Sequence, residues 1–171
     1  MKGCVIMRLR PYIHSKDYIY LEKWVREARI HSLWCAGIMP FPLNEQGLLY
    51  VLEREGETLC GSAYTATDES GCPLGFFVYS LDTENNKGFF KFVVTDNEKR
   101  GQGYGRRMLE LALKYASEIG GAKSAQLNVF DANYPARKLY TSLGFVQDSV
   151  LEDAMSFADE VWAKCHMEIK L

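Results

Sequence analysis

Three glycines at every second position, in the segment Arg100-Gly101-Gln102-Gly103-Tyr104-Gly105, separate an apolar run at 89–95 from a helical run at 104–119. The order is that of a strand, a glycine turn and a helix. A helix that begins directly after such a turn leaves its first N–H groups without intrahelical partners, and the helix dipole adds to their attraction for an anion. The segment therefore predicts a site for a phosphate or pyrophosphate.

The spacing of the glycines distinguishes between kinds of phosphate-binding loop. A dinucleotide fingerprint needs Gly-x-Gly-x-x-Gly, but its third position falls on Arg106 or on Met108, depending on the first glycine chosen. A Walker loop needs Gly-Lys-Ser or Gly-Lys-Thr, which the chain lacks. The pattern that remains is Arg/Gln-x-x-Gly-x-Gly. Taken alone it is also typical of a plain glycine turn, so a second feature must decide.

The N-terminal part predicts a short strand followed by helix. Residues 5–10 alternate apolar and polar side chains and are closed by Pro11, which indicates a strand. Apolar residues then recur at spacings of three and four, from an N-cap at Ser15 or Asp17 towards Trp34.

A segment with one glycine and two prolines, 35–42, interrupts this helical pattern. Asn44 then caps a second helix that reaches Gly56. Aromatic residues of this two-helix region, such as Trp24, are expected in the core, and lining a substrate pocket is the alternative.

From residue 58 onwards the pattern changes to short strands joined by turns and helices. The predicted elements are strands at 59–67, 74–81 and 89–95, a helix at 104–119, a strand at 125–130, a helix at 136–142, and strands at 145–150 and 161–169. A strand, a helix and a strand without a tight turn imply a right-handed parallel crossover. The predicted fold class is therefore α/β with layered α+β character. Residues 1–171 form a single domain whose mixed central sheet has six or seven strands flanked by helices, with an antiparallel N-terminal meander beside a parallel pair.

Composition narrows the function classes. With 171 residues, 47% hydrophobic and 25% charged, the chain suits one globular domain, and its net charge of −2 argues against nucleic acid as a partner. Five scattered cysteines without a Cys-x-x-Cys pair predict free thiols in a reducing compartment, and three separated histidines predict no metal site. No apolar run reaches membrane length. We expect a cytoplasmic protein with no membrane partner.

A second motif follows the first after one helix and one strand. It reads Asn133-x-x-Ala136-x-x-Leu139-Tyr140-x-x-x-Gly144-Phe145. Both motifs, in this order and at this distance, resemble those of the GNAT (Gcn5-related) N-acetyltransferase superfamily. The resemblance covers most of the chain from about residue 58, with Asn97 standing where many members have proline. It implies an acyltransferase that moves acetyl from acetyl-CoA, its cosubstrate, directly to a primary amine of a small molecule, peptide or protein in a ternary complex, without a metal.

The resemblance also implies where coenzyme A binds. In this family the fourth strand is bulged and splayed from the fifth, so that main-chain groups of Val93, Val94 and Thr95 face the pantetheine and polarise the thioester carbonyl. The pyrophosphate would lie on the amides from Gln102 to Arg106, within the loop that the resemblance assigns to the cofactor, namely Arg100, Gly101, Gln102, Gly103, Tyr104, Gly105 and Arg106.

Several side chains are further candidates for this cleft. Asn128 and Asn133 would contact the cofactor, although Asn133 is equally suited to cap a helix. The 3′-phosphate would attract one of several cations, which are Lys99, Arg106, Arg107, Arg137 and Lys138, and each is also suited to a solvated helix face.

Tyr140 is the candidate catalytic residue. The departing thiolate of coenzyme A needs a proton, which a positioned phenol can supply. From the pattern alone Tyr140 suits the core side of an amphipathic helix, and the family position favours the catalytic role. The sequence does not identify the general base that deprotonates the acceptor amine. The candidates are Glu84, Asp96, acids of the N-terminal helices and a water chain.

The alternative function is a non-catalytic acyl-CoA-binding or sensor protein of the same fold. The sequence leaves open the acceptor, other acyl groups and the oligomeric state, with a homodimer as one option.

Overall fold

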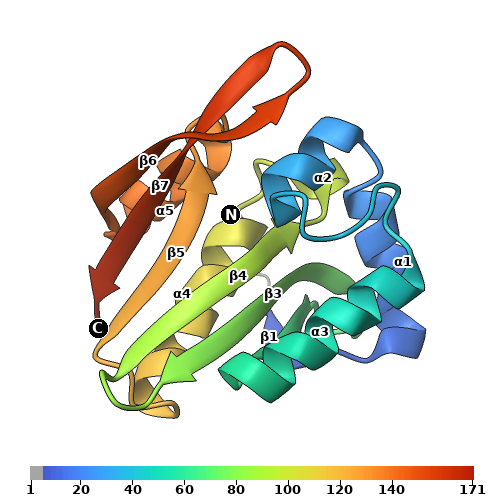
Figure 1. Cartoon of the computed structure of the whole chain (residues 1–171). Helices are drawn as coiled ribbons and strands as arrows, with labels where there is room; N and C mark the ends of the chain where they lie inside the picture. The colour runs from blue at the N-terminus through green and yellow to red at the C-terminus, as the bar shows by residue number, and fades with distance from the viewer. Residues whose placement is uncertain (1–5) are drawn as a thin grey trace.

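The structure, a computed structural model, describes residues 6–171. In this range one mixed sheet has the strand order β1-β2-β3-β4-β5-β7-β6, and helices cover both of its faces (Figure 1). The strands are β1 (Arg8–Pro11), β2 (Ser62–Thr67), β3 (Pro73–Asp82), β4 (Lys87–Thr95), β5 (Ser124–Phe130), β6 (Val146–Phe157) and β7 (Glu160–Lys170). The helices are α1 (His14–Trp24), α2 (Ala28–Cys35), α3 (Glu45–Leu59), the 3-10 turn η1 (Asn97–Lys99), α4 (Tyr104–Glu118) and α5 (Tyr134–Leu143).

The sheet has the predicted mixed topology. Strands β1 to β4 pair antiparallel, β4 pairs parallel with β5, and β5, β7 and β6 pair antiparallel. The expected fold class is thus confirmed, with seven strands among the described residues. The expected first strand begins at residue 5, which lies outside the described residues, and the observed β1 includes Pro11.

The N-terminal helical region differs from its prediction because it holds three helices. Helix α1 begins one residue after Ile13, and the Asp17 carboxylate reaches back to accept the Ile13 N–H at 2.8 Å. Asp17 therefore closes the first turn instead of capping the helix. The helix ends at Val25, whose φ of −112° departs from helical values, and α2 starts after Glu27.

The boundary between α3 and β2 is also displaced. Asn44 caps α3 as predicted, accepting the Gly47 N–H at 2.7 Å. The helix continues through Gly56 and ends only where Cys60 adopts a left-handed φ of 50°. Residues 59–61, expected in a strand, therefore end the helix and join it to β2, because a residue in the left-handed region ends a helix.

Two hydrophobic cores lie on opposite faces of the sheet. One joins the sheet to α4 and α5 and is centred on residues such as Leu109 and Leu127. The other joins β3 and β4 to α1, α2 and α3 around Trp24 and Leu48. On the face that carries α1 to α3, these helices stand over the half of the sheet formed by β1 to β4, whereas β5, β7 and β6 show no helix in front of them (Figure 1).

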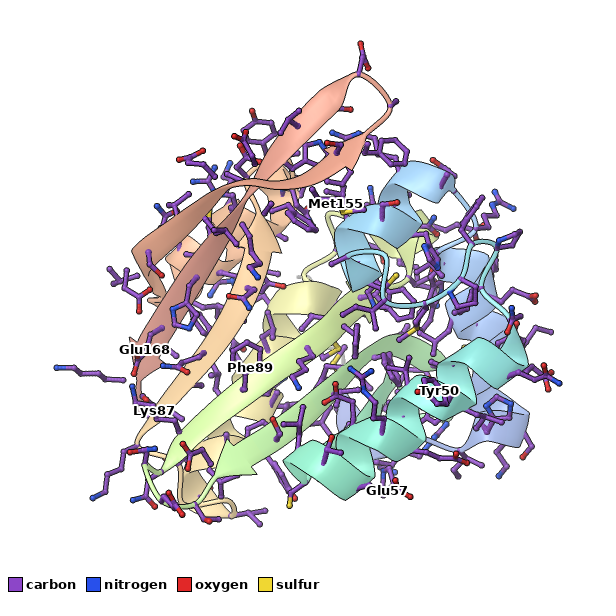
Figure 2. The ribbon with its side chains drawn as sticks, viewed as in Figure 1. Tyr50, Glu57, Lys87, Phe89, Met155 and Glu168 are labelled. Carbon is purple, nitrogen blue, oxygen red and sulfur yellow. The ribbon has the colours of Figure 1, made fainter. Side chains whose placement is uncertain are left out.

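The C-terminal hairpin is longer than predicted. Strand β6 continues to Phe157 instead of ending near residue 150, and Met155 pairs with Trp162 of β7. Residues 151–157 are mostly exposed in the structure. Their sequence therefore lacks the alternation of apolar and polar residues by which a half-buried strand is predicted. The hairpin reaches helix α2, where Met155 lies beside Gly37 at the end of that helix (Figure 2).

Candidate functional site

The glycine loop has the geometry that its spacing predicts. Gly101 and Gly103 have φ of 76° and 85°, a region that favours glycine. Gly103 is the N-cap of α4 without a side-chain cap, and the first intrahelical bond runs from the Arg107 N–H to the Gly103 carbonyl. The N–H groups of Tyr104 to Arg106 consequently have no partner within the helix, and they point towards the loop. This arrangement suits an anion.

The third glycine of the loop brings the two motifs together. A Cβ built on Gly105 would lie 3.1 Å from Leu139 Cδ2 and 3.8 Å from Thr95 Cγ2. A Cβ at this position would require the Leu139 side chain of α5 to shift by a small amount. The close approach places the second motif directly against the helix that begins at the loop.

Strands β4 and β5 separate beside this loop. Their parallel pairing covers only Lys87 to Phe90 on β4 and Ser124 to Leu127 on β5. Beyond it, Asn128 and the following residues of β5 pair with β7 alone. The two strands diverge towards their carboxyl ends in Figure 1. The β5-facing main-chain groups of β4 over residues 91–95 thus lack a strand partner.

A bulge sits at the start of this unpaired segment. Phe92 has a φ of 50°, and the register between β3 and β4 shifts there, because Phe76 pairs with Val94 while Val78 pairs with Lys91. Trp34 of α2 donates its indole N–H to the Phe92 carbonyl at 2.8 Å. The N-terminal helices therefore hold the bulge in place. Val93, Val94 and Thr95 follow the bulge, in the part of β4 that does not pair with β5, and their contact with a cofactor stays a prediction.

Tyr140 lies on α5 and is 6% exposed, within the core that joins the sheet to α4 and α5. Burial raises the pKa of its phenol, so the hydroxyl stays protonated at neutral pH. This hydroxyl makes no hydrogen bond to another of residues 6–171. Tyr140 is thus a buried phenol, and its catalytic role stays a prediction.

Three other residues predicted to bind the cofactor, Asn133, Asn128 and Arg106, lie in different surroundings. Asn133 caps α5 by accepting the Ala136 N–H at 3.4 Å, which is the structural role considered for it. Asn128 is exposed on β5, one residue beyond the last pair with β4. The Arg106 guanidinium donates to Ser142 and pairs with Glu110, so its main-chain N–H is the group that faces the loop.

The other predicted cofactor-binding residues with long side chains lie at the surface. Arg100 and Gln102 are exposed in the loop itself. Lys138 lines, with Arg137 and Thr141, a groove of about 660 Å³ between α5 and the C-terminal hairpin.

Sequence reasoning missed a contact that links α2 to the C-terminal hairpin. Arg29 forms two hydrogen bonds with Glu160, at 2.9 and 3.1 Å, and its guanidinium lies 5.4 Å from the ring of Trp162. Trp162 in turn donates to Glu160 at 2.8 Å. These three residues help to line a pocket of about 290 Å³ with Asp131 and Tyr134 at the carboxyl end of β5.

Two further polar pairs were missed beside the opening. Lys91 of β4 contacts Glu55 of α3 at 2.6 Å, and His166 of β7 contacts Asp148 of β6 at 2.6 Å. The packing of α3 on the sheet brings Glu55 to Lys91, whereas the β6–β7 register, with a bulge at Asp148, brings Asp148 to His166. A hairpin alignment of the last two strands was the signal that places Asp148 near His166.

Two negative findings apply to residues 6–171. No cluster of three or more histidine, cysteine, aspartate or glutamate side chains there has the geometry to hold a metal ion. No helix in this range combines the length and apolar character needed to cross a membrane.

A mixed sheet whose parallel pair splays beside a bulge and a glycine loop at a helix N-terminus defines the acyltransferase class to which the motifs pointed. The sequence model described as "Acetyltransferase (GNAT) family" matches residues 30–145. The chain belongs to this family.

Curated relatives and solved structures agree with this assignment. The chain is 28% identical over 78 residues to the spermine/spermidine N(1)-acetyltransferase of Bacillus subtilis (strain 168) and to the probable spermine N(1)-acetyltransferase of B. subtilis subsp. natto (strain BEST195). The match covers 42% of the chain and 51% of each relative, so the chain spans about half the length of the curated relatives it matches. A crystal structure of spermidine N-acetyltransferase from Vibrio cholerae in complex with CoA and spermine superposes with a TM-score of 0.80 at 19% identity, covering 96% of this chain and 95% of that one. This likeness concerns the fold.

Proposed function

We propose that this protein is an N-acetyltransferase that moves an acetyl group from acetyl-CoA to a primary amine by direct attack in a ternary complex. The observation that carries the proposal is the unpaired, bulged segment of β4 beside a glycine loop with free helix N–H groups. An extended thioester that carries a pyrophosphate fits this combination. The loop suits the anion, and the strand edge offers main-chain groups to an amide-containing arm.

The residues of this chain divide the proposed reaction between them. The N–H groups of Tyr104 to Arg106 bind and neutralise the pyrophosphate, and the main chain of Val93 to Thr95 orients the donor and polarises its carbonyl. The amine nitrogen then bonds to the carbonyl carbon, and the carbon–sulfur bond breaks. Tyr140 donates a proton to the departing thiolate, for which its raised pKa keeps the proton available at neutral pH.

We propose aliphatic polyamines as the first acceptors to examine, because the two curated relatives that match this chain are named as acetyltransferases of spermine or spermidine. Residues 6–171 hold no feature that by itself selects one amine over another. The acceptor class therefore rests on the relatives and not on the geometry.

The experiment has two arms. A thermal-shift assay compares acetyl-CoA, ATP and NAD, and only acetyl-CoA should raise the melting temperature, because a ligand that binds the folded state stabilises it by mass action. An acceptor screen of spermine, spermidine, amino acids, aminoglycosides and peptides is then monitored by release of the CoA thiol. Stabilisation by acetyl-CoA with no thiol release from any acceptor would favour a non-catalytic acyl-CoA-binding protein. Stabilisation by ATP or NAD alone would overturn the proposal.

A further inference from the structure

The proposed reaction needs a group that removes a proton from the acceptor. An aliphatic amine is an ammonium ion at neutral pH and cannot attack until it loses a proton. Two acids that the sequence offered are unsuited by their positions. Asp96 is buried and accepts the Glu98 N–H at 3.0 Å to cap η1, and Glu84 is exposed in the turn that precedes β4, at the opposite end of that strand from the glycine loop.

His166 lies where such a group is needed. It pairs directly with Asn128 of β5, the first residue beyond the last β4–β5 pair, Phe90 with Leu127. It is thus level with the point where the strands begin to separate. Its neighbours in β7, Cys165 and Met167, are buried in the core that includes α4.

His166 therefore points to the other face of the sheet, since side chains alternate along a strand. No helix stands in front of β7 on that face (Figure 1). The His166 side chain is 24% exposed, and its ring centroid lies 6.5 Å from that of Phe89 on β4. Figure 2 shows Phe89 beside β4 and β5, on the face of the sheet that is turned towards the viewer. An amine that approaches the opening from this face would pass the imidazole.

Asp148 fixes the orientation of this imidazole. Its Oδ1 lies 2.6 Å from His166 Nδ1, and the hydrogen bond with His166 lowers the pKa of the Asp148 carboxyl, which is therefore ionised at neutral pH. A carboxylate accepts only, so Nδ1 carries the hydrogen of this bond, and in the neutral imidazole the lone pair is then on Nε2. Among residues 6–171, no side chain or main-chain donor is bonded to Nε2.

The charged groups around His166 are otherwise engaged. On β7, Glu168 accepts from Gln126 of β5 and pairs with Lys87 of β4. On β4, Lys91 pairs with Glu55 of α3.

Two polar neighbours complete the surroundings of His166. Lys164 precedes His166 by two residues on the same face of β7, and on β6 Ser149 donates to Asp148. The His166–Asp148 pair is thus flanked by ion pairs that leave its outer nitrogen available.

We propose that His166, oriented by Asp148, accepts the proton of the acceptor ammonium, directly or through one water molecule. The assignment rests on the proposed acetyltransferase function. The ammonium gives its proton to Nε2, and the free amine attacks the carbonyl carbon of the thioester. As the carbon–sulfur bond breaks, Tyr140 gives its proton to the thiolate, and the second proton of the attacking nitrogen restores the phenol directly or through water. The imidazolium then releases its proton to solvent. The products are the acetamide, the CoA thiol and one proton, so that the reaction balances.

The test is the pH profile of kcat/KM for the best acceptor, measured for the whole chain and for H166Q, D148N and the control H14Q. His14 is a partly exposed histidine on α1 that bonds to Tyr12 at 3.0 Å, away from the splayed strands. H166Q should lower kcat/KM roughly 10²-fold, the lower range for general-base catalysis, and should lose the acidic limb of the profile. Affinity for acetyl-CoA, measured by calorimetry, should be unchanged.

D148N keeps the imidazole and tests its positioning. Its acidic limb should move to lower pH, because the imidazolium loses the carboxylate that stabilises it, and kcat/KM should fall by about tenfold. H14Q should match the wild type in both respects. An H166Q enzyme that keeps both its rate and its acidic limb would overturn the assignment while leaving the acetyltransferase function intact. If H166Q fails to bind acetyl-CoA, the test rests on D148N alone. An acidic limb of kcat/KM that lies at the same pH in D148N and in the wild type would then overturn the proposal.

Discussion

The two sides of the opening between β4 and β5 are built from different materials. The proposed donor side consists mainly of main chain: the N–H groups at the start of α4, the left-handed glycines before it and the unpaired edge of β4. The side proposed for the acceptor consists of side chains from α2, α3 and the β6–β7 hairpin, joined by contacts such as Arg29 with Glu160. The donor side therefore depends on backbone geometry, and the acceptor side depends on side-chain contacts between residues that are far apart in the sequence.

Tyr140 is the exception on the donor side, because there a side chain is expected to do the chemistry. Tyr140→Phe should lower turnover roughly 10²-fold while leaving the affinity for acetyl-CoA nearly intact, since the phenol acts on the departing thiolate and not on the bound donor. Steady-state kinetics and calorimetry with acetyl-CoA measure the two effects. Unchanged turnover would remove Tyr140 from the mechanism and leave a donor side made of backbone alone.

Gly103→Ala tests whether the donor side depends on backbone conformation. The variant should bind acetyl-CoA roughly tenfold more weakly, about 1.4 kcal/mol, because the left-handed N-cap that aims the N–H groups is disturbed. Gly121→Ala is the matched control. Gly121 has a φ of 72° against 85° for Gly103, a Cβ at either position meets open space, and Gly121 lies beyond the other end of α4.

Each of these two variants should lose about 1 kcal/mol of folding stability, since each forces an alanine into the left-handed region. Only Gly103→Ala should change the dissociation constant for acetyl-CoA. Equal affinities in the two variants would show that the loop geometry does not matter for the donor.

Trp34→Phe tests the contact between the two sides. Removing the indole N–H leaves the Phe92 carbonyl without its donor and should cost about 1–2 kcal/mol of stability. If the contact holds the bulge, affinity for acetyl-CoA should fall by about threefold, less than 1 kcal/mol. The control is Trp24→Phe, because the buried indole nitrogen of Trp24 has no hydrogen-bond partner among residues 6–171. A loss of affinity that is the same in both variants would point to general loosening of the helices.

Glu160→Gln should have the smallest effect, since its ion pair with Arg29 is exposed. We expect the acceptor KM to rise by about twofold. The hydrogen bonds from Arg29 and Trp162 lower the pKa of Glu160 from 4.5 to about 2. A lowered carboxyl pKa contributes stability that is present above the unfolded-state value and lost as the pH falls through the folded one. The melting temperatures of wild type and variant should therefore differ at pH 6 and converge as the pH falls towards 2.

The comparison also explains how much could be predicted. The glycine loop, the parallel pair and α5 were predicted because their signals are local: glycine spacing, an Asn cap and an apolar stripe lie within a few residues of each other. The acceptor side is made of long-range pairs, with Arg29 and Glu160 separated by 131 residues and Trp34 and Phe92 by 58. No periodicity in a single sequence encodes such pairs, and the exposed half of β6 left no burial pattern to follow.

The hydrogen bond from Trp34 to the Phe92 carbonyl has a consequence for how the two substrates would influence one another. It ties a helix of the acceptor side to the strand bulge beside which the donor is proposed to lie. An acceptor that steadies α2 would also steady the bulge, so each substrate would bind more tightly when the other is already present. Such coupling is reciprocal: the factor by which the amine raises the affinity for acetyl-CoA equals the factor by which acetyl-CoA raises the affinity for the amine. In a protein built this way, the hydrogen bond from Trp34 would be one of the links through which two unlike substrates bind cooperatively.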